Sequence, residues 1–402
     1  MTLPTPHADP PAWAIGAAGL LSLAVAMGIG RFAFTPLLPL MVQAGQIDVA
    51  GGGWLAAANY AGYLLGGVTA ARLGRSAPRL AVVALLATVL LTAAMAFEGP
   101  AGWWPALRLL AGVASAWAFI ATSVWCLTAL ARQGAGAWSS VFYAGVGTGI
   151  ALAGLYCLAG ASAGAAPGSL WLQLGAMALL LVLPVLWVLA RLSPLPAAAR
   201  GSRASAVAMP PGSRGLVGCY ALFGFGYILP ATFLPVMARS VVEDPRLFGL
   251  AWPAFGVTGA LSAVVAAALL RRASRLQVWS ASHALMGVGV LLPSLWRNGW
   301  TIALSALLVG GTFMVVTLAG VQEIRVRAPG DATALVSRMT SAFAAGQIAG
   351  PVASSLLLRL WPAHGLDIAL QAGAAVLLAS AAWLWRVSAS VGDQAPAARA
   401  RP

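Results

Sequence analysis

The chain has 402 residues, of which 60% are apolar and only 8% are charged. A soluble domain carries roughly a quarter of its residues as charges, so this composition excludes an ordinary soluble protein and indicates an integral membrane protein. The formal net charge of +14 comes from Arg alone, since the sequence contains no Lys. No basic block is interleaved with aromatic residues, which argues against a nucleic-acid-binding protein.

Apolar runs of the length that crosses a bilayer as a helix occur repeatedly along the chain. They are continuous rather than alternating, which favours helices over barrel strands. The first run follows a segment without Arg or Lys, so we expect it to be retained as a span rather than removed as a signal peptide. The twelve predicted spans are 14–42, 52–72, 79–98, 104–131, 137–161, 169–191, 214–238, 247–270, 276–296, 300–322, 337–360 and 366–387.

The distribution of Arg predicts the orientation of these spans. With both termini in the cytoplasm, seventeen Arg lie in cytoplasmic segments and only Arg239, Arg246, Arg297 and Arg359 lie in outer loops. This imbalance follows the positive-inside rule and predicts a multi-pass protein of the bacterial inner membrane. Eight Trp are predicted at outer span ends, as in an aromatic belt. These are Trp54, Trp103, Trp104, Trp171, Trp252, Trp296, Trp300 and Trp361.

The chain divides into two similar halves. Residues 28–41 and 224–237 align without a gap and share Gly, Gly, Leu, Pro and Met at matching positions. Such a repeat in an apolar chain suggests a duplicated membrane protein. A Pro-, Ala-, Ser- and Arg-rich segment between the halves is typical of a linker. We therefore predict a six-helix bundle at 1–191, a cytoplasmic linker at 192–213, a six-helix bundle at 214–388 and a disordered cytoplasmic tail at 389–402.

Three local patterns, together with this architecture, resemble the major facilitator superfamily. They are the Gly-rich basic segment Gly67 to Arg75, the segment Arg108 to Gly112, and Gly-rich patterns in spans 5 and 11. The resemblance implies an all-α fold of twelve transmembrane helices in two pseudo-symmetric bundles. It also implies gating roles, and we assign these to Arg72, Gly74, Arg75, Gly145, Gly149, Gly346, Gly350 and Pro351.

These gate patterns depart from the family in two places. Ala71 stands where the basic loop usually has Asp, so Arg72 and Arg75 can equally be topology anchors only. The span 5 pattern lacks its usual Pro, whereas Pro351 is present in span 11. A Gly at every fourth position still offers a groove to a neighbouring helix, and Pro bends a span.

Finer features resemble the YbfB/YjiJ-type group of bacterial major facilitator transporters, over nearly the whole chain. They are Gly30-Arg31-Phe32, the Asn59 to Gly66 segment, Gly224 to Ile228, Thr232 to Pro235, Gly310 to Met314, and Gln347. The resemblance to this group implies a transport function but does not predict the substrate.

Two charges lie inside predicted spans, Arg31 and Arg108. A charge within the membrane is costly and usually faces a cavity where it works. The resemblance places spans 1 and 4 beside the central cavity, so both guanidiniums are candidates to bind one anion, such as a carboxylate or phosphate. Arg108 has a structural alternative, as a post that bonds helix carbonyls.

Five polar side chains in the spans are further candidates for the substrate site: Asn59, Tyr63, Tyr227, Thr312 and Gln347. Asn59 and Tyr63 are four residues apart and therefore share one helix face. The alternative for all five is a helix-packing hydrogen bond.

No Asp or Glu lies deep within a span, although a proton-coupled transporter often uses such a carboxylate. Glu98, Glu323 and His283 remain as candidates for protonation, and His283 fits better as a packing histidine.

We therefore expect a monomeric secondary transporter that moves a small organic anion by alternating access, driven by protons. The alternatives are an exporter of apolar or cationic compounds and a non-transporting membrane sensor. The sequence shows no nucleotide-binding loop, no nucleophile and base set and no metal-ligand cluster, so we expect no enzyme, cofactor or metal.

Overall fold

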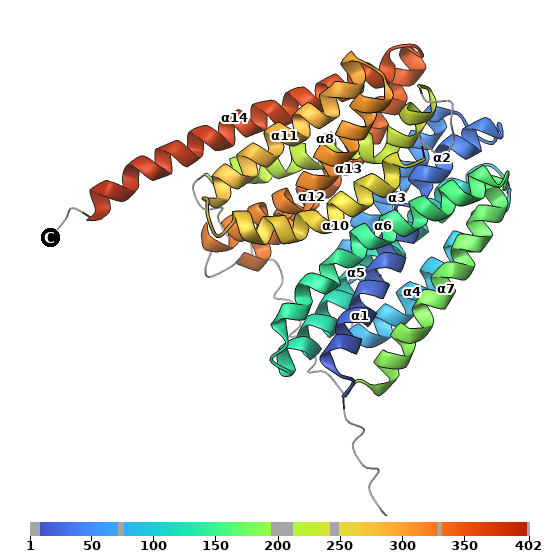
Figure 1. Cartoon of the computed structure of the whole chain (residues 1–402), viewed down its shortest axis with the longest axis horizontal. Coiled ribbons are helices and arrows are strands. Elements are labelled where there is room, and N and C mark those ends of the chain that lie inside the picture. Colours follow the sequence, from blue (N-terminus) through green and yellow to red (C-terminus); the bar gives the residue numbers. More distant parts are fainter. Residues whose placement is uncertain (1–8, 71–75, 194–211, 242–248, 328–331, 400–402) are drawn as a thin grey trace, which may run out of the picture.

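A computed structural model of the chain describes residues 9–70, 76–193, 212–241, 249–327 and 332–399. Every regular element in these residues is helical (Figure 1). The first half contains α1 (Ala12–Leu23), η1 (Ala24–Ile29), α2 (Phe34–Gln43), α3 (Val49–Ala70), α4 (Ala77–Ala94), α5 (Trp103–Arg132), η3 (Gly136–Trp138), α6 (Ser139–Ser162) and α7 (Pro167–Arg191). The second half contains α8 (Ser213–Arg239), α10 (Ala251–Leu269), α11 (Arg275–Leu295), α12 (Gly299–Arg327), α13 (Ala332–Leu360) and α14 (Gly365–Arg399).

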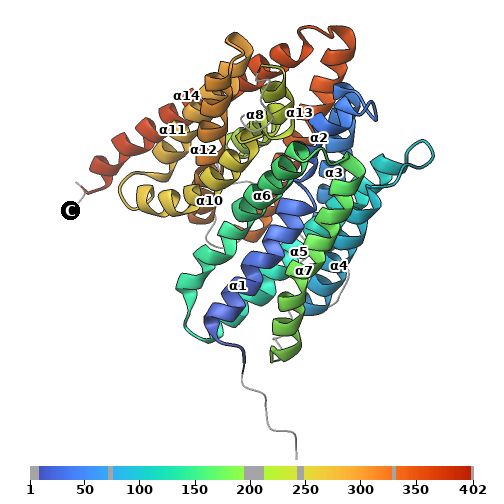
Figure 2. The same ribbon diagram turned by 45° about the vertical axis from the view of Figure 1, so that its right-hand side comes forward.

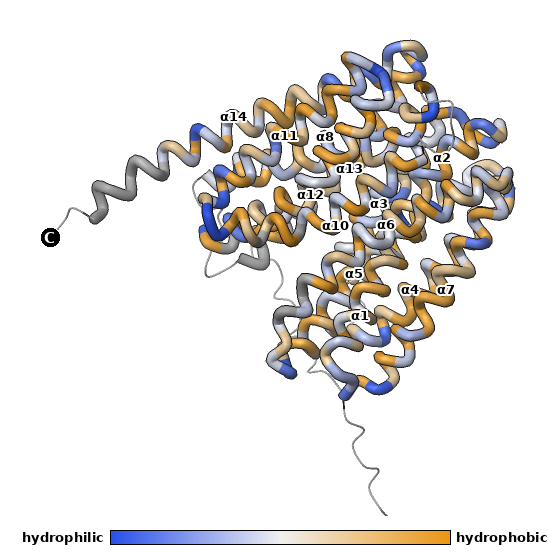
Figure 3. Tube along the Cα trace, viewed as in Figure 1, coloured by the Kyte–Doolittle hydropathy of each residue, from blue (hydrophilic) through white to orange (hydrophobic). Residues whose placement is uncertain are grey.

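Counting α1, η1 and α2 as one broken helix, the described residues form twelve long helices, as the sequence predicted. Ten of them are long and apolar enough to cross a membrane. Hydrophobic residues predominate along the helices, and strongly hydrophilic residues are most frequent near the helix ends (Figure 3). The chain is therefore a multi-pass membrane protein with an all-α fold.

The two halves meet at one end of the helices and diverge toward the other (Figures 1 and 2). Across the junction, α3 packs on α13 and α6 packs on α10, while α2 packs on α8. The end where the halves meet carries the loops predicted to be poor in Arg, and we call it the Arg-poor side. The opposite end, where α8 begins at Ser213 after α7 ends at Arg191, is the Arg-rich side.

The first span is broken in its middle. A π-helical segment, η1, ends at Ile29, and a turn separates it from α2, which begins at Phe34. The backbone N–H of Thr35 donates to the Phe32 carbonyl at 3.2 Å, and Pro36 has no N–H to donate. The carbonyl of Arg31 therefore lacks its usual helical donor, which matters for the site described below.

Glycines let the helices within each half approach closely, and they do so symmetrically. An added Cβ on Gly28 would lie 2.3 Å from the backbone of Gly149, on α6. An added Cβ on Gly224, its partner in the repeat, would lie 2.3 Å from the carbonyl oxygen of Phe343, on α13. Each repeat thus packs its first helix on its fifth through the same glycine.

The helix α14 continues to Arg399, into the segment from residue 389 for which the sequence predicted a disordered tail. One prediction about the periphery is wrong. Trp171 and Trp252 are almost fully buried and do not belong to an interfacial belt, whereas Trp296 and Trp300 are well exposed. The Trp252 ring lies 6.2 Å from that of Phe32, in the junction between the halves.

Candidate functional site

Hydrogen bonds between the halves close the Arg-poor side. The Ser355 hydroxyl donates to the Ala50 carbonyl at 2.9 Å, and the Thr35 hydroxyl donates to the Ala231 carbonyl at 2.8 Å. Deeper in the membrane, the hydroxyls of Tyr60 and Thr232 lie 3.4 Å apart. Sequence patterns pointed to Tyr60 and Thr232 but not to Ser355.

A second closure forms where α6 crosses α10. An added Cβ on Gly147 would lie 2.5 Å from the Gly256 carbonyl, and one on Gly256 would lie 2.5 Å from the Ala151 nitrogen. The two backbones are therefore in direct contact, which only glycine permits here. Sequence analysis missed this pair because it assigned gating to Gly145 and Gly149, which share one face of the helix. Gly147 lies between them in the sequence and therefore on a different face.

The guanidinium of Arg31 lies at the inner limit of this closed region. Its Nη2 donates to Oε1 of Gln347, in the opposite half, at 2.8 Å. Its Cζ lies 4.1 Å from the centre of the Tyr63 ring and 4.9 Å from that of Tyr60, distances typical of cation–π contact. The side chain is only 3% exposed, and its Nε has no acceptor.

Gln347 connects Arg31 to the second half. Its amide nitrogen donates to the Tyr227 hydroxyl, and its oxygen accepts from Arg31, so both ends of the amide are occupied. Gln347 and Tyr227 are buried. The structure thus brings together three residues that the sequence nominated separately.

Arg108 has a different environment. Its Nη2 donates to the Arg31 carbonyl at 3.0 Å and its Nη1 donates to the Gly30 carbonyl at 3.4 Å, while its Cζ lies 4.7 Å from the centre of the Phe34 ring. Arg108 therefore satisfies the carbonyl that the break in the first span leaves without a donor. This geometry matches the structural post that the sequence left as an alternative.

Three other nominated residues are placed as follows. Asn59 is buried and donates to the Arg108 carbonyl at 2.9 Å, so it joins α3 to α5. Tyr63 is half-buried beneath Arg31. The Thr312 hydroxyl donates to the Leu308 carbonyl of its own helix at 2.6 Å, which leaves it outside the polar network around Arg31.

The glycines expected to gate transport pack within the halves. Gly145 and Gly149 lie against the backbones of Leu20 and Ala24, in the first span. Gly346 and Gly350 lie against α8, and Pro351 accepts a hydrogen bond from Ser354 at 3.0 Å. The other expected gate residues, Arg72, Gly74 and Arg75, lie outside the described residues.

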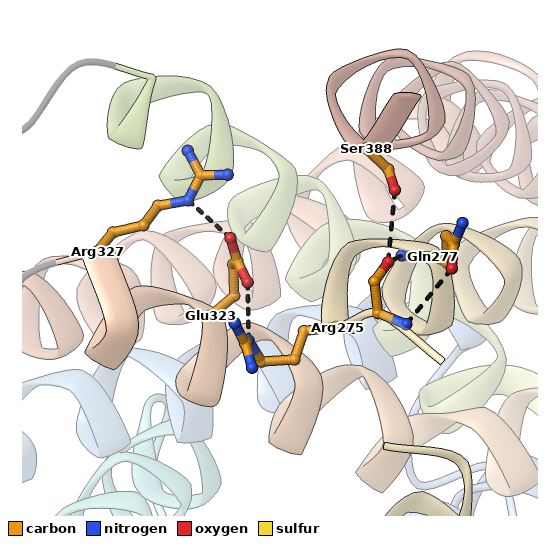
Figure 4. Close-up of polar contacts among 6 residues, drawn as sticks. Arg275, Gln277, Glu323, Arg327 and Ser388 are labelled. Carbon is orange, nitrogen blue, oxygen red and sulfur yellow. Dashed lines mark hydrogen bonds and ion pairs between the residues drawn. The ribbon is translucent and has the colours of Figure 1, made fainter. Parts of the chain in front are cut away.

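The two protonation candidates of the second half, Glu323 and His283, bond to partners other than Arg31. Glu323 accepts from Arg275 at 2.9 Å and from Arg327 at 2.7 Å, which ties the Arg-rich end of α12 to the start of α11 (Figure 4). His283 accepts from Trp279 Nε1 and pairs with the Ser380 hydroxyl, each at 2.9 Å. Its two ring nitrogens are thus both occupied within the α11 and α14 packing.

No ion pair in the described part of the chain involves Arg31 or Arg108. The three ion pairs found there join Glu323 to two Arg near the Arg-rich side, and Arg297 to Asp367 near the Arg-poor side. The two intramembrane guanidiniums are therefore balanced only by neutral oxygens and aromatic faces.

Comparison with known proteins agrees with this fold. A family described as "Uncharacterised MFS-type transporter YbfB" matches residues 23–384. A search of curated proteins found no match. Among solved structures, a bacterial homologue of the human lysosomal transporter Spinster, inward-facing and occupied, has a TM-score of 0.72 at 14% identity, covering 94% of this chain and 97% of that chain. The nucleoside transporter NupG has a TM-score of 0.68 at 14% identity, covering 93% and 98%. At these identities the likeness shows the fold alone.

Proposed function

Because the chain belongs to the YbfB family of major facilitator transporters, which are not enzymes, we propose that it carries a small organic anion and binds the negative charge at Arg31. The observation that supports this proposal most strongly is a buried guanidinium with a free Nε and no carboxylate partner among the described residues. A charge in the membrane interior costs several kcal/mol unless it is paired, on the order of 3 kcal/mol on insertion scales. A bound anion supplies that pairing.

The present partners of Arg31 are weaker than an anion would be. Gln347 is a neutral acceptor, and the rings of Tyr60 and Tyr63 provide only cation–π attraction. A carboxylate forms shorter and stronger charge-assisted bonds, often with two guanidinium nitrogens at once. An anion that reaches Nε therefore competes with Gln347 for Arg31.

We assign the anion to Arg31 and not to Arg108. Both terminal nitrogens of Arg108 already donate to carbonyls of the broken first span. Withdrawing them would leave buried carbonyls without donors, at a cost of about 1–3 kcal/mol each. The guanidinium of Arg108 supports the site, because it holds the backbone carbonyls of Gly30 and Arg31 and adds positive potential near the anion.

Transport follows by alternating access. The contacts across Ala50, Thr35 and Gly147 close the Arg-poor side, and we propose that the halves rock to open it and to close the Arg-rich side. With the Arg-rich side in the cytoplasm of a bacterial cell, this structure is the inward-facing state. We further propose that protons drive the cycle and that Glu323, held by two Arg at the inner end, is the residue that takes part.

Thermal-shift screening of the purified chain against a panel of small carboxylates and phosphates tests the proposal. For any anion that stabilises the protein, Arg31→Gln should weaken binding about ten- to hundredfold, the value of roughly 1.5–3 kcal/mol for a bond to a charged group. Arg359→Gln is the matched control, because Arg359 is exposed near the Arg-poor side. Unchanged affinity in folded Arg31→Gln, or stabilisation by cations alone, refutes the proposal.

A further inference from the structure

An aromatic cluster begins beyond Gln347, two hydrogen bonds from Arg31. Gln347 bonds the Tyr227 hydroxyl, and the Tyr227 ring stacks on Phe343 with centres 5.5 Å apart and planes 7° apart. Phe313 lies 4.9 Å from Tyr227 on another side. Phe223 also belongs to the cluster, 5.0 Å from Phe343 and 5.2 Å from Tyr227, and Tyr220 lies 5.3 Å from Phe343. Three helices, α8, α12 and α13, supply these rings.

Two of the rings keep part of their surface exposed. Tyr227 and Phe223 are fully buried, whereas Phe313 and Phe343 are half-buried. Phe343 precedes Gln347 by four residues on α13, so it lies on the same helix face, one turn closer to the Arg-rich side. The two halves diverge on that side (Figure 2). Phe343 therefore lies on the Arg-rich side of Gln347, and both Phe343 and Phe313 keep exposed surface that a ligand of Arg31 could contact.

Polar groups in this wall are already occupied. The Thr312 hydroxyl donates to Leu308 and the Thr317 hydroxyl donates to Phe313, each along its own helix. The Tyr227 hydroxyl accepts from Gln347. A ligand rich in hydroxyls finds few free partners here, and a planar apolar body fits better, because aromatic faces favour offset or edge contacts with another ring.

We propose that the ligand is an aromatic monocarboxylate, with its carboxylate on Arg31 and its ring against Phe313 and Phe343; this inference rests on the anion transport proposed above. A single negative charge matches the site. The Nε of each intramembrane Arg has no acceptor, but both terminal nitrogens of Arg108 are held by backbone carbonyls, whereas the side-chain acceptor of Arg31 is the neutral Gln347. A dianion such as a phosphate monoester would bring one charge more than Arg31 neutralises.

Titration calorimetry of the purified chain at pH 7 with four probes tests this inference: benzoate, cyclohexanecarboxylate, acetate and phenyl phosphate. We expect benzoate to bind most tightly, at least tenfold more tightly than acetate. Phe343→Leu and Phe313→Leu should each weaken benzoate three- to tenfold and leave acetate unchanged. Phe343→Tyr keeps the ring and should keep the preference, and Phe97→Leu, at an exposed Phe, is the matched control.

The outcomes separate this inference from the proposed function. If benzoate binds no more tightly than acetate, or if the Leu variants leave benzoate affinity unchanged, the aromatic wall is not part of the site, while loss of acetate binding in Arg31→Gln would still support anion transport. Tighter binding of phenyl phosphate overturns the monoanion assignment. If none of the four probes binds and benzylamine does, both proposals fail.

Discussion

Replacing Gln347 by Leu should open the Arg-poor side. The change keeps the volume of the side chain but removes the oxygen that accepts from Arg31 at 2.8 Å and the nitrogen that donates to Tyr227. The bond to Arg31 joins the two halves, so it exists only while they are in contact at this level. Its loss therefore destabilises the state seen here and leaves the oppositely open state unaffected.

The size of the shift follows from the type of bond. A hydrogen bond to a charged group is worth about 1.5–3 kcal/mol, so its loss shifts the equilibrium between the two states about ten- to hundredfold toward the form open on the Arg-poor side. Thr35 reports this shift, because its side chain is 3% exposed and bonds the opposite half in the closed state.

The assay is maleimide labelling of Thr35→Cys with a membrane-impermeant reagent, after the three native Cys, all buried, are replaced. Labelling should rise at least tenfold when Gln347→Leu is added. The control is Gln173→Leu, since Gln173 accepts only from Tyr156 of its own half at 2.9 Å. Equal labelling with and without Gln347→Leu, or the same rise with Gln173→Leu, would show that the Arg31 bond does not hold this side closed.

Three further predictions concern the supporting structure. Arg108→Ala should destabilise the protein by about 2–6 kcal/mol, since it leaves two buried carbonyls without donors, and unfolding in denaturant should show this; a change within 0.5 kcal/mol would contradict its role as a post. Gly256→Val should prevent the close contact with Gly147 and increase labelling of the Arg-poor side, whereas Gly218→Val, at a glycine with free space around it, should not. Glu323→Gln should weaken proton-driven uptake in proteoliposomes and leave ligand binding intact; normal uptake would remove Glu323 from the coupling proposal.

The number of spans and the charged residues within them could be predicted from the sequence, because both depend on the free-energy cost of burying a charge in the membrane. The positions of the twelve helices agree with the predicted runs, and Arg31 stood out as the single charge in the first of them. Gln347 and Tyr227 were nominated only as isolated polar groups. Their connection to Arg31 depends on how α8 and α13 pack against the first half, which composition does not reveal.

The residues that close the Arg-poor side were harder to predict for a different reason. Gly147 and Gly256 carry no chemistry, and this chain has 46 glycines, so their contact becomes visible only when α6 crosses α10. Ser355 is one of many Ser in apolar helices, most of which bond their own backbone. Phe343 was likewise hidden, since a single aromatic residue in a membrane helix ordinarily faces lipid or a neighbouring helix.

Under the proposed function, the two intramembrane guanidiniums have complementary tasks, which connect the break in the first span to transport. Arg108 holds the Arg31 carbonyl, which fixes the backbone of Arg31 to α5 of the first half. The Arg31 side chain, in contrast, bonds Gln347 of the second half. A ligand that draws the guanidinium away from Gln347 therefore leaves the backbone in place and breaks a bond between the halves. Ligand binding and the rocking of the halves then both depend on the Arg31 guanidinium. The free energy of ligand binding therefore shifts the equilibrium between the two arrangements of the halves.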